Sequence, residues 1–377
     1  MNKFLSRVIR VAKILILLYF FLVSISLMSH SFKCFGKGFS EQLLTTTSNP
    51  VVALFVGLLA TSVIQSSSTT TSMVVGFVAG GVLSIHNAIP IIMGANIGTT
   101  VTNTIVAVGH VTRKEEFRRA FSSATMHDFF NVLTVLILFP FELCTGYLEK
   151  TAGHIASFLE HSGGIKATDP IKVVIKPAVS FCDNVLIGPL HLSEKTAGIV
   201  MLVLSFIVLI LALIGLVGVM KSIVANRTEI VLDKLLARSG FAALIMGFLF
   251  TAIVQSSSVT TSILVPMVGA GVLRVETVYP LILGANLGTT VTALLASLTG
   301  NVAAITIALV HILFNLTGVL IFYPFAFMRK IPVAMAKTWS AIVAERRWMA
   351  FVYVGIMFFM LPLLLIWIDR LIGLSRR

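Results

Sequence analysis

Charged residues are scarce in this sequence. Only 11% of its 377 residues are Asp, Glu, Lys or Arg, whereas 57% are hydrophobic. A water-soluble domain carries about 25% charged residues, so a chain of this composition cannot cover a surface that faces water. The composition therefore excludes a soluble globular protein and indicates a protein whose solvent is lipid.

Cysteine is also rare, and no secretory cleavage signal is present. Cys34, Cys144 and Cys182 have no metal-ligand spacing in the sequence, and their odd number argues neither for nor against a disulfide. The first apolar run has basic flanks but lacks a small-residue cleavage site. We expect this run to be retained as a membrane helix.

Acidic residues are outnumbered by basic ones, 15 to 28, which gives a net charge of +13. In a soluble protein such an excess would suggest a nucleic-acid partner. Here the cations lie mostly in short clusters beside apolar runs, which is typical of cytoplasmic loops under the positive-inside rule. No nucleic-acid partner is therefore expected.

Runs long enough to span a bilayer are separated by two unusual regions. The predicted spanning runs are Val11–Ser29, Arg119–Pro140, Ala197–Met220, Val302–Phe327 and Met349–Ile368. The unusual regions, Val51–Ala107 and Phe241–Ser297, are apolar but interrupted by Gly, Ser, Thr, Asn and Pro. Backbone that leaves helical geometry at membrane depth must be buried in protein or line a cavity.

The two interrupted regions are copies of each other. Gln65–Ser68 and Gln255–Ser258 have the same sequence, Gln-Ser-Ser-Ser, at a spacing of 190 residues. Over the 38 positions from Gln65 and from Gln255, 22 residues are identical, including Pro90 with Pro280. The match continues at a spacing of 184, where His127, Asn131 and Pro140 correspond to His311, Asn315 and Pro324.

Loop charges indicate that the repeats have opposite orientations. The loop before the last helix of repeat 1 holds Arg113, Lys114, Arg118 and Arg119, whereas its counterpart Leu298–Asn301 is uncharged. We expect an all-α polytopic membrane protein with two inverted-topology repeats, re-entrant hairpins and discontinuous transmembrane helices. The expected parts are an N-terminal helix and connector (1–50), repeat 1 (51–141), an inter-repeat loop, linking transmembrane helix and cytoplasmic connector (142–240), repeat 2 (241–328), and a basic loop with a C-terminal helix (329–377).

Each Gln-Ser-Ser-Ser motif lies in the middle of an apolar stretch, where every polar group needs a partner. A helix break at this point exposes backbone N–H groups at the start of the following half-helix, and these donors attract an anion. Carbonyl groups at the end of the preceding half-helix attract a cation, an arrangement that is typical of discontinuous helices in transporters. The alternative is helix packing through Ser and Thr, which the presence of two matching motifs disfavours.

The second repeated motif is Gly-Ala-Asn-x-Gly-Thr-Thr-x-Thr, at Gly94–Thr102 and Gly284–Thr292. Its glycines allow close backbone approach or a non-helical turn, and Asn96 and Asn286 could cap a helix after such a turn. Thr99 and Thr102 would share a helix face, as would Thr289 and Thr292, and their neutral oxygens suit Na⁺. A small-residue packing seam is the alternative, and both roles are compatible.

Ionisable residues within the apolar helices are few. An intramembrane Asp is costly and indicates function, and Asp128 has no acidic counterpart because Ile312 occupies the equivalent position. This asymmetry suits a cation site in one half. The alternatives are an Asp128–His127 pair or a carboxylate near the membrane interface. His127 and His311 are predicted to be structural histidines with satisfied hydrogen bonds.

At these residues the chain resembles the type II sodium–phosphate cotransporter family in its short bacterial form. The resemblance covers nearly the whole chain and includes both Gln-Ser-Ser-Ser motifs, Phe117–Phe121, His127–Asn131 and Gly284–Thr292. It implies phosphate between the two motifs and a Na⁺ site from Gln255, Ser256, Ser257, Thr289 and Thr292. The complete set of phosphate candidates is Gln65, Ser66, Ser67, Ser68, Gln255, Ser256, Ser257, Ser258, Asn96 and Asn286. The further sodium candidates are Gln65, Ser66, Thr99, Thr102 and Asp128.

The resemblance implies a sodium-coupled importer of inorganic phosphate, preferring the divalent anion, that works by alternating access. Because the Asp128 context matches electrogenic members, net positive charge movement is expected. The expected partners are phosphate, Na⁺ as the co-transported ion and the lipid bilayer, with no organic cofactor and no enzymatic activity. The protein is expected to be multi-pass in the cell membrane with a cytoplasmic N-terminus, and a homodimer is left open.

Three other functions are alternatives. The same fold could carry another oxyanion or a dicarboxylate. An intramembrane enzyme with a serine nucleophile is disfavoured because no Gly-x-Ser-x-Gly motif occurs and no Lys lies within the serine motifs. A channel is the third alternative. It would differ from a carrier in needing no binding site that is closed from both sides, and its flux would not saturate as a carrier's does.

Overall fold

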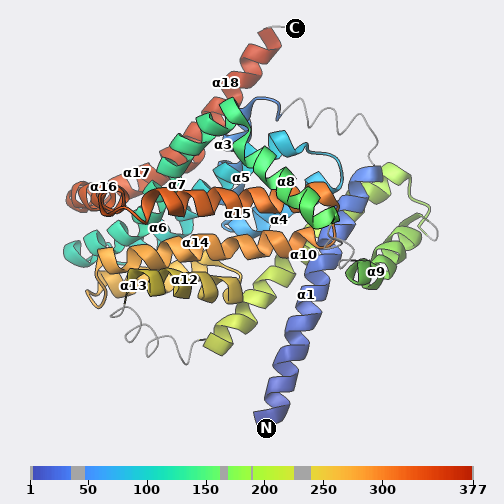
Figure 1. The fold of residues 1–377 in the computed structure, drawn as a ribbon, viewed down its shortest axis with the longest axis horizontal. Coiled ribbons are helices and arrows are strands. Elements are labelled where there is room, and N and C mark those ends of the chain that lie inside the picture. Colours follow the sequence, from blue (N-terminus) through green and yellow to red (C-terminus); the bar gives the residue numbers. More distant parts are fainter. Residues whose placement is uncertain (1–2, 35–46, 162–168, 188–189, 225–238, 376–377) are drawn as a thin grey trace.

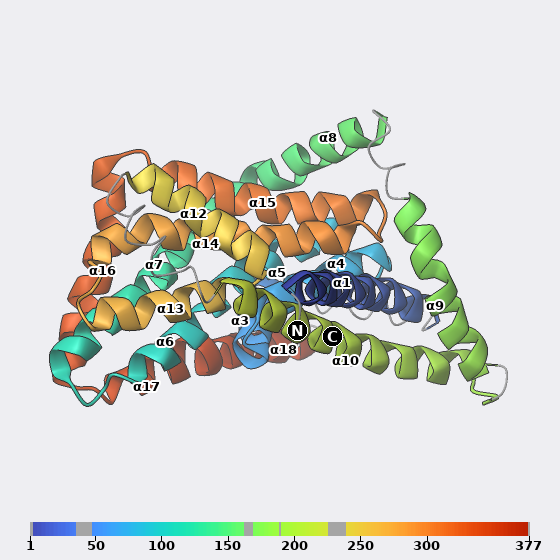
Figure 2. The same ribbon diagram turned by 90° about the horizontal axis from the view of Figure 1, so that it is seen from below.

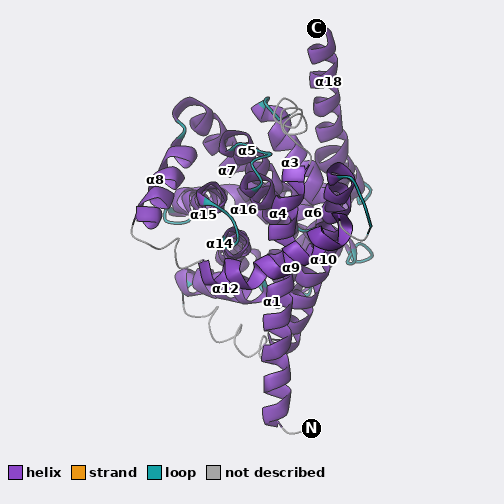
Figure 3. Cartoon of the chain, turned by 90° about the vertical axis from the view of Figure 1, so that its right-hand side faces the viewer, coloured by secondary structure: helices purple, strands orange, loops and turns teal. Residues whose placement is uncertain are grey.

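All regular elements are helices in the residues that the computed structural model describes, namely 3–34, 47–161, 169–187, 190–224 and 239–375 (Figure 3). The helices of the first half are α1 (Lys3–Cys34), α3 (Pro50–Ile64), α4 (Ser67–Ala79), α5 (Ile85–Gly98), α6 (Thr100–Val108), α7 (Lys114–Thr145), α8 (Tyr147–His161) and α9 (Asp169–Ile187). Those that follow are α10 (Glu194–Val224), α12 (Gly240–Val254), α13 (Ser257–Gly269), α14 (Val275–Ser297), α15 (Val302–Phe322), α16 (Ala326–Glu345), α17 (Met349–Gly355), the π-helix η2 (Ile356–Met360) and α18 (Leu361–Ser375). The predicted connectors before the two repeats fall largely on residues 35–46 and 225–238, which lie outside the described residues.

Seven helical stretches of the described chain are long and apolar enough to cross a membrane. They are Val8–Phe32, Ile85–Val108, Lys114–Thr145, Glu194–Val219, Val275–Ser297, Val302–Phe322 and Met349–Ile372. Five of them each contain most or all of one predicted spanning run, so the prediction that these five runs are helices is confirmed. The other two, Ile85–Val108 and Val275–Ser297, lie inside the interrupted regions. This set of helices is that of a multi-pass membrane protein.

Each interrupted region contains a sharp helix break at its glutamine. α3 ends at Ile64 and α4 begins at Ser67, and the intervening Gln65 has left-handed backbone angles of φ 60° and ψ 25°. Gln255 interrupts α12 and α13 in the same way, with φ 60° and ψ 24°. Because L-residues other than Gly rarely adopt this conformation, both breaks are specific features of the fold. The predicted discontinuity of the two helices is confirmed.

The repeated glycines let neighbouring helices touch through their backbones. α3 packs along α5, and α12 packs in the same way along α14. A Cβ atom on Gly94 would overlap the Leu54 carbonyl oxygen, and one on Gly284 would overlap the Leu244 carbonyl oxygen. The packing seam is therefore present, and Gly94 and Gly284 form no non-helical turn because both lie within helices, whereas Gly98 ends α5 one residue before the interruption at Thr99.

This continuity also corrects the predicted role of two asparagines. Asn96 lies inside α5, where its Nδ2 donates to the Ile92 carbonyl oxygen one turn earlier, and Asn286 lies inside α14. A helix cap requires a chain that enters the helix at that residue. Asn96 and Asn286 therefore cap no helix, contrary to the prediction.

The two halves of the chain are interleaved. α7 of the first half packs against α16 of the second, and α15 of the second half packs against α8 of the first. In the same reciprocal manner, α4 contacts α14 and α13 contacts α6, while α1 lies along α10 (Figure 2). The free end of α1 and the end of α18 project in opposite directions from this bundle (Figure 1). The polar residues of both repeats are thereby enclosed between helices from both halves.

Candidate substrate and ion site

The two serine motifs meet inside the bundle. The Ser68 hydroxyl donates to the Gln255 backbone carbonyl oxygen at 3.1 Å, although the two residues are 187 positions apart. The Thr292 hydroxyl lies 3.5 Å from Ser68 Oγ and donates to Gln255 Oε1 at 2.8 Å. The motif of repeat 1 therefore contacts both repeated motifs of repeat 2 directly.

Each helix break pairs a glutamine oxygen with a threonine hydroxyl. Thr102 donates to Gln65 Oε1 at 2.8 Å, as Thr292 does to Gln255 Oε1. Gln65 Nε2 donates to the Ser62 carbonyl oxygen at 2.6 Å, and Gln255 Nε2 donates to the Ala252 carbonyl oxygen. Each amide is thus held from both ends, which directs its oxygen toward the threonine. The result is one cluster of neutral oxygen atoms per repeat, suited to a hard monovalent cation.

The serines lie at the first turn of the half-helices. The hydroxyls of Ser66 and Ser256 accept hydrogen bonds from the backbone N–H groups of Thr69 and Val259, which makes them N-caps of α4 and α13. Ser67, Ser68 and Ser257 are buried, and Ser258 is half-buried. The first N–H groups of an α-helix have no acceptor within the helix. These groups and the positive ends of two helix dipoles favour an anion at this position.

Thr99 and Thr289 lie one turn before Thr102 and Thr292 in the two repeats. The Thr99 hydroxyl donates to the Ala95 carbonyl oxygen at 3.2 Å, and the Thr289 hydroxyl donates to the Ala285 carbonyl oxygen at 3.1 Å. Both hydroxyl hydrogens are therefore used within the helix. The oxygen lone pairs stay available as acceptors.

The predicted phosphate ligands Asn96 and Asn286 are engaged in a buried amide network. Asn286 Nδ2 donates to Asn131 Oδ1 at 2.7 Å, and Asn315 Nδ2 donates to Asn96 Oδ1 at 3.2 Å. The two bonds are equivalent, because Asn96 corresponds to Asn286 and Asn131 corresponds to Asn315 in the two repeats. The network holds the halves together, and the assignment of Asn96 and Asn286 to phosphate stays a prediction.

The two repeated histidines differ in their environments. The His127 ring nitrogens lie 3.3 Å from the Thr100 hydroxyl and 3.2 Å from Asn286 Oδ1. The prediction of a satisfied histidine is therefore confirmed for His127. It is wrong for His311, whose two ring nitrogens are buried without a hydrogen-bond partner in the described part of the chain. Thr290, the counterpart of Thr100, instead donates to the Leu287 carbonyl oxygen, and Asn96 Oδ1, the counterpart of Asn286 Oδ1, accepts from Asn315.

Asp128 is buried in α7 and is 1% exposed. Its Oδ2 accepts a hydrogen bond from the Tyr353 hydroxyl of α17, and its Oδ1 has no partner among the described residues. The alternative of an Asp128–His127 pair is wrong, because the hydrogen-bond partner of Asp128 is Tyr353, whereas the alternative of a carboxylate near the membrane interface stays open. An incompletely paired buried carboxylate is costly.

Sequence reasoning gave no role to several residues that complete the site. Asn131 and Asn315 join the halves, and their matching spacing of 184 could have singled them out. The Thr261 hydroxyl bonds Asn103 Oδ1, which links α13 to α6. No sequence pattern pairs Tyr353 with Asp128, since the two residues are 225 positions apart.

The sequence of this chain is similar to a family of known proteins in both of its halves. A profile of the family described as "Na+/Pi-cotransporter" matches residues 20–156 and 208–364, one segment in each half of the chain. The sodium-dependent phosphate transport protein 2B of Homo sapiens is 35% identical over 437 aligned positions, covering 92% of this chain. The sodium-dependent phosphate transport protein 2A of Rattus norvegicus is 35% identical, and the alignment covers 97% of this chain and 68% of the rat protein. The chain spans 63% of the human protein's length, and no solved structure matches it.

Proposed function

This chain belongs to the Na+/Pi-cotransporter family, and on that basis we propose that it is a sodium-coupled symporter that imports inorganic phosphate across the cell membrane. The observation that carries the proposal is the contact between the two broken helices, where the Ser68 hydroxyl meets the Gln255 carbonyl group. A single packing seam needs no helix break, and two breaks that meet at one point are typical of transporters.

Phosphate would lie between the starts of α4 and α13. The N–H groups of Ser67, Ser68, Ser257 and Ser258 belong to these first turns, and the serine hydroxyls can add donors. No Lys or Arg occurs in either motif. A dehydrated divalent anion at this depth would be very costly on its own, so co-bound cations are required.

Sodium would bind at the oxygen clusters formed at the helix breaks. In repeat 2 the cluster contains Gln255 and Thr292, with Ser256, Ser257 and Thr289 close to it in the sequence. Repeat 1 has the equivalent pair of Gln65 and Thr102. Because Na⁺ lowers the cost of bringing in the anion, phosphate raises the affinity for Na⁺ by the same factor. This reciprocity is the basis of coupling.

Asp128 would supply a third cation position. Its carboxylate is buried in α7, Ile312 occupies the equivalent position of repeat 2, and its Oδ1 lacks a partner among the described residues. A Na⁺ ion beside this oxygen would compensate the buried charge. Transport would then move net positive charge together with divalent phosphate.

We further propose that the repeats have inverted topology and that α3–α4 and α12–α13 are re-entrant hairpins. Helices of 13 to 15 residues are too short to span a bilayer, which supports re-entry. The reciprocal contacts of α7 with α16 and of α15 with α8 support a two-fold relation between the halves. Alternating access would follow from movement of one half against the other around the shared site.

A basic cavity gives further support to an anionic substrate. It has a volume of about 470 Å³, and the charged residues that line it are Arg118, Arg119, Arg274, Lys337 and Glu276, the last of which pairs with Lys337. The Arg119 side chain also donates to the Gly269 carbonyl oxygen at 2.9 Å, at the end of α13. A basic cavity next to the end of a re-entrant helix would attract phosphate to that side of the membrane.

Uptake of labelled phosphate into proteoliposomes that contain the purified protein tests the function. We expect rapid saturable uptake under an inward Na⁺ gradient and little uptake under an equal K⁺ gradient. Equal uptake in the two salts would disprove the coupling.

The identity of the cargo is tested in the same vesicles by competition. Unlabelled arsenate, which resembles phosphate in shape and charge, should compete, whereas sulfate and succinate should not. Stronger competition by succinate or sulfate would identify a carrier of dicarboxylates or of another oxyanion on this fold.

A further inference from the structure

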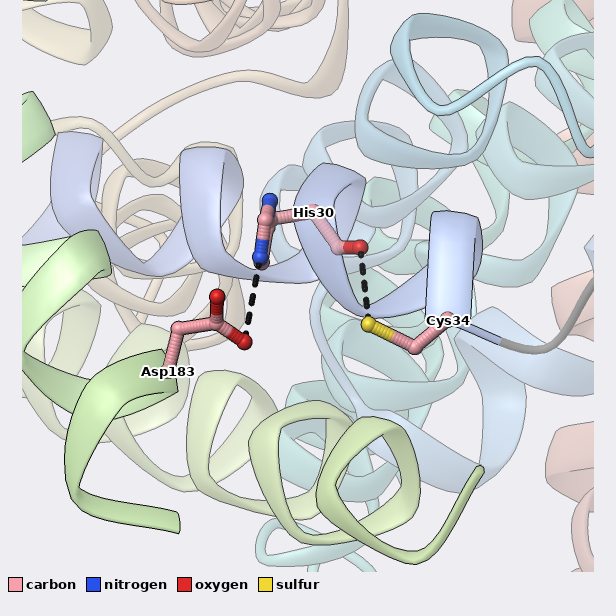
Figure 4. A group of neighbouring side chains, drawn as sticks. All are labelled: His30, Cys34 and Asp183. Atoms are coloured by element: carbon pink, nitrogen blue, oxygen red, sulfur yellow. Dashed lines mark hydrogen bonds and ion pairs between the residues drawn. The ribbon is translucent and has the colours of Figure 1, made fainter. Parts of the chain in front are cut away.

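Helices α1 and α9 bring together three side chains of metal-ligating types, at a position outside the serine motifs. His30 and Cys34 lie on α1 and Asp183 lies on α9 (Figure 4). One ligand atom from each side chain lies within 4.8 Å of the other two. All three side chains are half-buried, so they are sheltered but reachable from solvent.

The distances fit a tetrahedral metal ion. His30 and Cys34 are four residues apart and so share one face of α1. His30 Nε2 lies 3.4 Å from Asp183 Oδ1, and two such ligands on tetrahedral zinc stand about 3.3–3.5 Å apart. Cys34 Sγ now donates to the His30 carbonyl oxygen at 3.7 Å. A shift of the sulfur by about 1 Å would complete the zinc geometry.

The donor set selects the class of ion. Imidazole nitrogen and thiolate sulfur are ligands of zinc and related transition metals, whereas Mg²⁺ and Ca²⁺ prefer oxygen ligands. His30 and Asp183 also line a cleft of about 500 Å³ between α1 and α9, which leaves room for a water ligand. The Asp183 and Glu194 carboxylates act electrostatically on Cys34, and their negative potential attracts a cation. Lys176 lines the same cleft and opposes this attraction.

We propose that His30, Cys34 and Asp183 form a site for a divalent transition metal of the zinc class, with water as the fourth ligand. The site joins two helices that are distant in the chain, because α1 ends at Cys34 and α9 begins 135 residues later, at Asp169. A bound metal would fasten α9, which follows repeat 1, onto α1, which precedes it. The site is independent of the proposed transport function.

Thiol protection tests this site in the purified full-length protein. In a Cys144→Ser/Cys182→Ser background, Cys34 is the one remaining thiol. Zn²⁺ should slow its alkylation by a maleimide at least about tenfold, because a metal-bound thiolate is shielded from the reagent, and EDTA should restore the rate. His30→Ala and Asp183→Asn should each abolish the protection, whereas the matched control His154→Ala on α8 should retain it.

Cobalt absorption gives a second readout that does not depend on transport. With Co²⁺, the protein should show a thiolate-to-metal charge-transfer band and the visible bands of tetrahedral cobalt. Cys182→Ser, which removes the thiol next to Asp183, should retain both signals, whereas Cys34→Ser should lose them. Absence of these bands, absence of zinc protection, or protection that persists in His30→Ala and Asp183→Asn would overturn the proposal.

Discussion

At the scale of single residues, Gln255 combines a structural and a chemical role. Its backbone reverses the chain in the left-handed region, its carbonyl oxygen accepts from Ser68, and its side-chain oxygen accepts from Thr292. A turn alone would be better served by Gly, which adopts positive φ without steric cost. The presence of Gln at both breaks therefore points to a requirement for the amide group.

Replacement of Gln255 by Gly separates the two roles. Gln255→Gly should fold normally, since the backbone conformation is kept, but sodium-coupled phosphate uptake should fall roughly ten- to a hundredfold. The oxygen would be lost as a Na⁺ ligand, and if that contact is worth as much as a hydrogen bond to a charged group, about 1.5–3 kcal/mol, the loss corresponds to this range. His191→Gly, at the remaining non-glycine residue with positive φ among those described, is the matched control and should leave uptake unchanged. Normal uptake by Gln255→Gly would reduce Gln255 to a turn residue.

Asp128 is the residue on which charge movement is expected to depend. Asp128→Asn keeps the size and the acceptor for Tyr353 but removes the negative charge, so it should lower the charge moved per phosphate by about one. The measurement compares transport current with phosphate flux. Tyr353→Phe, which removes the hydrogen bond and keeps the carboxylate, should leave the ratio unchanged. The same ratio in wild type and Asp128→Asn would contradict a cation at this carboxylate.

At the scale of elements, the backbone contact between α12 and α14 sets the position of the second motif. Gly284 and Gly247 face each other's helices, and a Cβ on Gly247 would overlap the Leu281 carbonyl oxygen. α3 and α5 repeat this arrangement with Gly57 and Gly94. Because Thr292 is carried by α14 and Gln255 by the end of α12, the glycines determine the separation of these two side chains.

Substitution of the interface glycine should therefore be destabilising. Gly284→Ala must push α12 away from α14, and such overpacking costs about 1–3 kcal/mol. The matched control is Gly153→Ala in α8, where an added Cβ meets nothing within 4 Å and where Ala gains up to about 1 kcal/mol of helix propensity. Thermal unfolding in detergent should show a lowered midpoint for Gly284→Ala and an unchanged or raised one for Gly153→Ala. Equal midpoints would mean that the helices can separate freely.

At the scale of the whole molecule, the halves are joined by reciprocal polar contacts. Asn286 on α14 bonds Asn131 on α7, and Asn315 on α15 bonds Asn96 on α5, so each repeat supplies two asparagines from two different helices. Polar contacts between membrane helices contribute about 0.6 kcal/mol each on average. Such modest bonds would stabilise one arrangement of the halves and still allow another, as the proposed alternating access would require.

A double-mutant cycle measures this connection. Asn131→Ala and Asn286→Ala should each lower the unfolding free energy, and their joint effect should be smaller than the sum by about 0.6 kcal/mol. Unfolding by SDS in mixed micelles provides the free energies. Asn131→Ala combined with Asn301→Ala, a cap of α15 outside the network, should be additive. Additivity in the Asn131–Asn286 pair would show that the contact does not couple the halves.

Much of the fold was predictable from local patterns. The apolar runs placed five spanning helices, and the register of Gln65 with Gln255 located both helix breaks. The Gly94 and Gly284 motifs predicted a close helix contact. The predicted capping role of Asn96 and Asn286 was wrong. It depended on a turn at the preceding glycine, but glycine occurs both in turns and where helices pack closely, and only the position of the neighbouring helix distinguishes the two.

The candidate site was predictable in its composition but not in its connections. The repeat singled out Gln65, Ser68, Gln255 and Thr292 as polar residues at membrane depth. That Ser68 reaches Gln255 across the halves, and that His311 lacks the partner that His127 has, depends on how α4, α7, α14 and α15 pack. Tyr353 beside Asp128 and Asp183 beside His30 come from helices far apart in the chain, so no spacing could predict them.

The sequence by itself determined that this protein lies in lipid, that its chain is duplicated, and that each copy breaks a helix at a glutamine. These properties follow from composition and from short-range backbone chemistry, which neighbouring residues control. Only the tertiary structure decided which oxygens and amides face one another, because hydrogen bonds between the halves depend on distances of a few ångströms between helices remote in the chain. The meeting of Ser68 with Gln255, at 3.1 Å, is a product of that packing.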